Sequence, residues 1–80
     1  MRVGMLWYDD DRAQALGDKV GKAANYYRSK YGRVPDLCIA NPKTLGKNPP
    51  KEVGGLKLRS SGSVLPNHYW LGVDEMAKRS

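Results

Sequence analysis

Three consecutive carboxylates, Asp9, Asp10 and Asp11, follow an apolar run that ends in Trp7 and Tyr8. Carboxylate oxygens are the ligands that Mg²⁺ prefers, so the triplet is a candidate cation site. Aspartate is also a preferred helix N-cap, and acids in a first helical turn interact favourably with the helix dipole. Capping is favoured, because no second acid, lysine or nucleophile elsewhere completes the metal chemistry. We expect Asp10 or Asp11 to cap the next helix.

The residue types needed for nucleophilic catalysis are present, but none stands in a recognisable context. His68 is the single histidine, beside Tyr69 and Trp70, and Cys38 is the single cysteine, within an apolar run. Hydrolysis needs a nucleophile, a base and an orienting group, and no spacing here supplies all three. We expect Cys38 to be a buried, inert thiol. The prediction is a protein without catalytic residues or cofactors.

Basic residues dominate the chain, which has 14 Lys and Arg against 8 Asp and Glu and a formal net charge of +6. A basic body of this kind attracts polyanions. A nucleic-acid-binding surface could be built from the basic residues of a central loop and the strand after it, with aromatic side chains nearby. These residues are Lys43, Lys47, Lys51, Lys57 and Arg59. The alternative is that these side chains only face water.

The first half of the chain reads as strand, helix, strand. Residues 2–8 are apolar on both alternating faces, which predicts a central strand. Residues 12–31 carry apolar side chains at spacings of three and four, ended by Gly32, which predicts a helix. Residues 36–41 form a second buried strand. This order predicts a βαβ unit with parallel strands.

The second half begins with a loop over 42–55 rich in Pro, Gly and Lys. Segments 56–60 and 68–73 alternate apolar and polar residues, which predicts an antiparallel hairpin with a wide loop. The whole chain is predicted to be one α+β domain over 1–75 with a polar tail at 76–80. Its two layers would be one long helix on a mixed sheet of about four strands.

A single helix covers only one face of a sheet, and four aromatic residues cannot all lie under it. The predicted interface therefore consists of Trp7, Tyr8, Tyr69 and Trp70. The leading hypothesis is a small non-enzymatic module that self-associates as a homo-oligomer or docks on a protein partner through this aromatic face. Nucleic-acid binding is the first alternative, and a Mg²⁺-dependent enzyme using Asp9–Asp11 is the second.

Two partial resemblances to known families concern different parts of the chain. The opening "MRVGMLWYDDDR" resembles the start of a response-regulator receiver domain, but the next strand ends in "IANP" without the phospho-accepting aspartate, so receiver activity is rejected. Residues 32–72 are similar to the helix-strand-hairpin segment of tailed-phage capsid and encapsulin-type proteins. The matched positions are Gly32, Pro35, Asp36, Asn41, Pro42, Gly55, Leu65, Pro66 and Gly72. This likeness implies a shared hairpin geometry, and the chain also resembles small basic proteins of bacterial and phage genomes.

Apolar segments long enough to cross a membrane are absent from the sequence, and no signal-peptide pattern is present. The single cysteine cannot form an internal disulfide. A cytoplasmic protein that does not bind membranes is expected.

Overall fold

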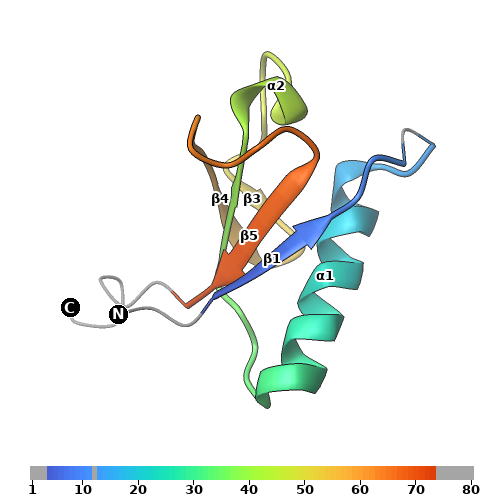
Figure 1. The fold of residues 1–80 in the computed structure, drawn as a ribbon, viewed down its shortest axis with the longest axis vertical. Helices are drawn as coiled ribbons and strands as arrows, with labels where there is room; N and C mark the ends of the chain where they lie inside the picture. Colours follow the sequence, from blue (N-terminus) through green and yellow to red (C-terminus); the bar gives the residue numbers. More distant parts are fainter. Residues whose placement is uncertain (1–3, 12, 74–80) are drawn as a thin grey trace.

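The computed structural model describes residues 4–11 and 13–73, which form one helix-backed sheet (Figure 1). In chain order the elements are β1 (Gly4–Tyr8), α1 (Leu16–Tyr31), β2 (Leu37–Ala40), α2 (Pro42–Leu45), β3 (Glu52–Val53), β4 (Leu56–Ser60) and β5 (His68–Gly72). The α+β class is confirmed, with five strands where about four were predicted. The predicted polar tail, 76–80, lies outside the described residues.

The sheet has the strand order β1-β5-β2-β4-β3. β5 is antiparallel to both β1 and β2, so β1 and β2 run parallel but are not neighbours. β4 is parallel to β2 and antiparallel to β3. β1 is therefore an edge strand, not the central strand that its apolar character suggested.

The hairpin predicted from segments 56–60 and 68–73 is not formed, because β2 lies between β4 and β5. Alternation of apolar residues determines which face of a strand is buried, but it does not determine which strand is its neighbour. A different hairpin joins β3 to β4. Its turn residues Gly54 and Gly55 both have positive φ, at 57° and 83°, as a two-residue turn of this kind requires.

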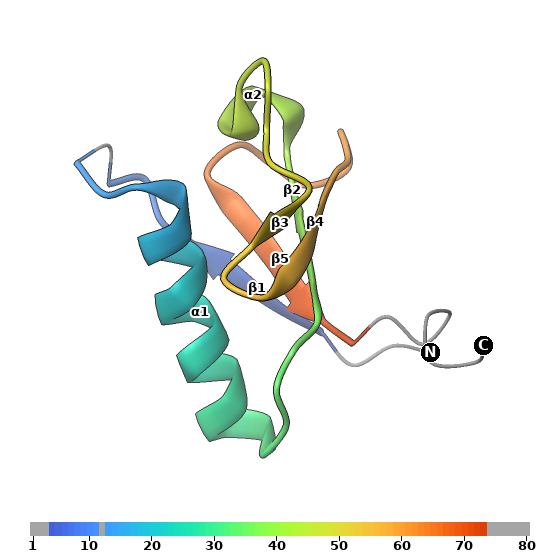
Figure 2. The same cartoon turned by 180° about the vertical axis from the view of Figure 1, so that it is seen from behind.

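Helix α1 covers one face of the sheet, and Figure 2 shows it in front of β1 when the molecule is turned. The helix begins at Leu16 and ends at Tyr31, and its C-cap residue Gly32 adopts the left-handed conformation with φ 70°. The buried core combines three residues of the helix with alternate residues of the strands: Val20, Ala23 and Tyr27 with Met5, Cys38, Ala40, Val53, Leu56, Leu58, Tyr69 and Leu71. Among the described residues, no helix is long and apolar enough to cross a membrane.

Candidate binding surface

The face of the sheet that points away from α1 is called the open face. The core residues Met5, Leu71 and Cys38 are in register across β1, β5 and β2, so their chain neighbours point to the opposite side. The open face therefore carries Leu6, Tyr8, Leu37, Ile39, Lys57, Arg59, His68 and Trp70. Leu6, Trp70, Ile39 and Arg59 form one continuous row across four strands.

Trp70 lies flat across the middle of this face. A Cβ built on Gly4 would overlap the indole atoms Cζ2, Cε2 and Nε1, and a Cβ on Gly72 would come within 2.9 Å of Cζ3. The two glycines are register partners on β1 and β5, and both lie on the same side of Trp70 along the strands. They leave the space in which the indole rests against the backbone, so the ring forms a flat apolar platform.

One end of the open face is walled by the connection from β4 to β5. The Nδ2 of Asn41 donates to the carbonyl of Val64 at 2.8 Å, and the backbone N–H of Asn67 donates to Oγ1 of Thr44 at 2.8 Å. Oδ1 of Asn41 also accepts from the N–H of Lys43, which caps α2. The short helix α2, which lies within the segment predicted as a loop, therefore holds this connection in place.

Between this wall and the sheet lies a hollow of about 500 Å³. It is lined by Leu6, Ile39, Ser61, Ser63, Val64, Leu65 and Trp70. Leu6 and Leu65 are 60% and 65% exposed and line the same hollow, so they form part of one exposed apolar patch. The hollow is apolar, open to solvent and rimmed by the two serine hydroxyls.

The four aromatic residues of the predicted interface are divided between the two faces. Tyr69 is 1% exposed and belongs to the core, and Trp7 lies on the helix side with its ring 5.4 Å from that of Tyr26. Tyr8 and Trp70 lie on the open face. The Tyr8 ring is 57% exposed and lies 4.9 Å from the His68 ring.

The aspartate triplet does not cap α1. The N-cap is Ala15, without a side-chain hydrogen bond, so the expectation that Asp10 or Asp11 would cap is wrong. Oδ1 of Asp9 accepts from the N–H of Asp11, and Oδ1 of Asp11 accepts from the N–H of Ala13, so these carboxylates shape the connection before the helix. Among the described residues, no three His, Cys, Asp or Glu side chains gather as a metal site requires.

Asp10 instead accepts a hydrogen bond from the Tyr8 hydroxyl at 2.9 Å. This bond, followed by partial desolvation and the negative charge of Asp10, raises the pKa of Tyr8. The hydrogen bond fixes the Tyr8 ring at the exposed end of the open face.

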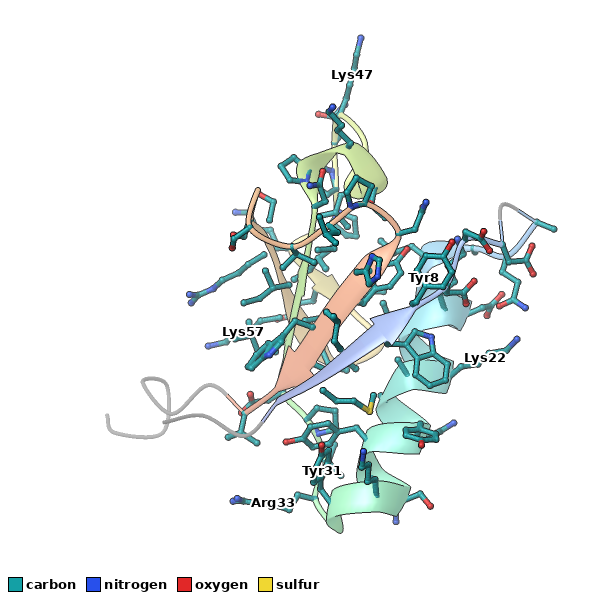
Figure 3. All side chains as sticks on the ribbon, viewed as in Figure 1. Tyr8, Lys22, Tyr31, Arg33, Lys47 and Lys57 are labelled. Carbon is teal, nitrogen blue, oxygen red and sulfur yellow. The ribbon has the colours of Figure 1, made fainter. Side chains whose placement is uncertain are left out.

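The five basic residues of the predicted nucleic-acid surface are spread over the molecule. Lys57 and Arg59 lie on the open face beside Leu37 and Ile39 in register. Lys43 lies in α2, and Lys47 and Lys51 lie in the connection from α2 to β3. Figure 3 shows Lys47 at the α2 end of the molecule and Lys57 at the side of the sheet.

The candidate catalytic groups are each engaged or buried. Nδ1 of His68 lies 2.9 Å from the carbonyl of Pro66, and the Ser61 and Ser63 hydroxyls bond each other at 2.7 Å. Cys38 is fully buried, as predicted, and burial raises the pKa of its thiol to about 12. These residues do not assemble a nucleophile with a base.

Comparison of the chain with protein-family models, curated proteins and solved structures finds no match. The sequence indicated an uncovered apolar face. The structure adds two features: the Trp70 indole rests against Gly4 and Gly72, and Val64 and Leu65 line one side of the hollow. These additions depend on strand register and on a long-range hydrogen bond, which periodicity does not encode.

Proposed function

We propose that this protein is a non-enzymatic binding module and that its open face docks on a segment of a partner protein carrying both apolar and acidic side chains. The observation that carries the proposal is the row Leu6, Trp70 and Ile39, which runs across three strands and is not covered by any described element. Exposed apolar surface gathered in this way is typical of protein interaction sites.

The shape of the open face supports docking of apolar side chains. The hollow has a volume of about 500 Å³, within the range of sites that bury small ligands or anchoring side chains. Trp70 supplies a rigid flat floor, and Leu65 supplies an exposed wall. Aromatic residues in such positions often contribute most of the binding energy of an interface.

The charge of the open face favours an acidic partner. Lys57 and Arg59 continue the apolar rows, and the facing strand contributes one carboxylate, Glu52, opposite Lys57. The chain as a whole carries +6.

Packed sheets lie about 10 Å apart, close to the Debye length of about 8 Å at physiological salt. Face-to-face stacking of two copies would therefore bring like charges together.

The proposal is tested by selecting a random-peptide display library on the immobilised protein. Recovered peptides should combine apolar residues with Asp or Glu, and L6D should abolish their binding. V34D is the matched control, because Val34 is 67% exposed and lies outside the open face. Recovery of no peptides, or of peptides that bind the L6D protein equally well, would reject the open face as a docking site.

A second candidate, binding of single-stranded nucleic acid, is favoured by one specific observation. The flat indole of Trp70 shares the open face with Lys57 and Arg59, and an aromatic platform beside cations is how such proteins stack bases and hold phosphates. Anisotropy of a labelled oligothymidylate should then show affinity that falls steeply with salt and is lost in W70A. Absence of binding at low salt would eliminate this candidate.

A further inference from the structure

The outer edge of β1 offers a row of backbone groups that no described strand pairs. β1 is the first strand in the sheet order, so only its inner edge meets a neighbour, β5. The other edge of the sheet is β3, with only two residues. β1 therefore provides the longer open edge.

The ladder between β1 and β5 determines which β1 groups face outward. The N–H of Asp9 donates to the carbonyl of Asn67 at 2.9 Å, continuing the register in which Trp7 faces Tyr69. Antiparallel pairs alternate between bonded and non-bonded. The residues bonded inward are therefore Met5 and Trp7 along with Asp9. The N–H and C=O groups of Gly4, Leu6 and Tyr8 point away from β5, toward the outer edge of the sheet.

We infer that the partner segment of the proposed function binds as an added β-strand along β1. An extended chain there would bond to Gly4, Leu6 and Tyr8, and alternate side chains would extend the open face beside Leu6. This inference rests on the proposed function and names the conformation in which the partner is held. It also commits the partner to an alternating pattern, because successive side chains of a strand point to opposite faces.

The helix side of the added strand explains why an acidic segment fits. In Figures 1 and 2, α1 extends beyond the outer edge of β1, on the sheet side opposite the open face. Tyr26 is 50% exposed, and Figure 3 shows Lys22 projecting past β1. Side chains of the added strand that turn away from the open face would meet this Tyr26 and Lys22 surface. Carboxylates at those positions would pair with the Lys22 ammonium.

A second copy of the chain fits this edge less well than a single extended segment. Symmetric pairing of two β1 strands would place both α1 helices on the same side of the joined sheet, and each extends past its own β1 edge (Figure 2). The two helices would then compete for the same space. An isolated peptide strand brings no helix with it.

The test uses a synthetic, end-blocked peptide of alternating Val and Glu, with a peptide of the same composition but with Val and Glu in separate blocks as control. The ¹⁵N-labelled wild-type protein is titrated while amide exchange is followed. Binding should be saturable for the alternating peptide only. The Leu6 and Tyr8 amides should gain protection, whereas Met5 and Trp7, already bonded to β5, should change little.

N-methylated peptides separate strand addition from side-chain docking. One version is methylated on every Val nitrogen and the other on every Glu nitrogen. Because alternate N–H groups of a strand point to the same side, only one version should bind, and the other should lose about tenfold or more in affinity, the effect of removing backbone hydrogen bonds. Equal binding of both would overturn the inference and leave the proposed function standing.

Three further outcomes would also overturn the inference. The first is no saturable binding of the alternating peptide, and the proposed function is then judged by the peptide selection alone. The second is binding that protects only amides around Ile39 and Trp70, which would show docking in the hollow without strand addition. The third is protection of the Leu6 and Tyr8 amides without peptide, with a concentration-dependent dimer in light scattering, which would assign the edge to a second copy.

Discussion

Replacing Gly4 with alanine would place a methyl group in the space that the Trp70 indole occupies, because the new Cβ would overlap three ring atoms. The indole must then move away from the backbone of β1 and β5 against which it packs. Overpacking of this kind costs about 1–3 kcal/mol. Removing a glycine from a strand returns about 0.4–1 kcal/mol through the lower entropy of the unfolded chain. The expected net loss in unfolding free energy is about 1–2 kcal/mol.

The assay is urea unfolding followed by circular dichroism, with tryptophan fluorescence reporting on the indole. For a domain of this size the expected loss corresponds to a melting temperature lower by about 4–16 °C. G21A is the matched control, because a Cβ on Gly21 meets nothing within 4 Å. An alanine inside a helix should stabilise by up to about 1 kcal/mol, so the same chemical change has opposite signs at the two sites.

A double-mutant cycle with W70A isolates the overlap. In the W70A protein the space beside Gly4 is empty, so G4A should there be neutral or stabilising. Two results would contradict this contact: G4A as stable as the wild-type protein, or G4A that destabilises the W70A protein by the same amount as the wild type. Either result would mean that the indole does not rest on Gly4.

Three other perturbations test separate parts of the structure. N41A should lower the unfolding free energy by about 1–2 kcal/mol, because it removes the α2 cap and leaves the Val64 carbonyl without its donor. N41D keeps the cap acceptor but loses the donor to Val64, so amide hydrogen exchange at residues 61–67 should become faster. Exchange as slow as in the wild-type protein would show that the Asn41–Val64 hydrogen bond does not hold this connection. The Cys38 thiol, with its pKa near 12, should react with a disulfide reagent at pH 8 only after addition of denaturant, and prompt reaction of the folded protein would show that the site is open. Burial raises the pKa of Tyr27, Tyr69 and Cys38 in the folded state, so the unfolded chain loses these protons first. The stability contributed by these groups should therefore fall as the pH rises from about 9 to 12, and urea midpoints that stay flat across that range would contradict their burial.

The sequence predicted the helix, its Gly32 end, the strands around Cys38 and Tyr69, and an apolar face that one helix leaves uncovered. These features follow from periodicity within a single segment, so local reasoning reaches them. The sequence did not predict that β5 lies between β1 and β2, because apolar residues on both faces of a strand are found in a central strand and also in an edge strand with an exposed apolar face. It also missed the two-residue strand β3, although Gly54-Gly55 between apolar residues is a hairpin signal.

The aspartate triplet shows the same limit for a candidate site. Asp is common both at helix caps and in turns that precede helices, and the difference here is a few residues of chain between Asp11 and Leu16. The residue types alone do not predict how many residues separate Asp11 from the first residue of the helix. Only the backbone path shows that the carboxylates bond to N–H groups of the connection.

The insertion of β5 between β1 and β2 has a consequence for the order of folding. Gly4 pairs with Gly72, so the first described strand finds its neighbour only when the last one is present. During synthesis on the ribosome, β1 must remain without its partner until β5 has emerged, whereas β2, β4 and β3 can pair before that point. Loss of β5 would leave β1 with no neighbouring strand, so in a truncated chain β1 could not join the ladder that β2, β4 and β3 form with one another.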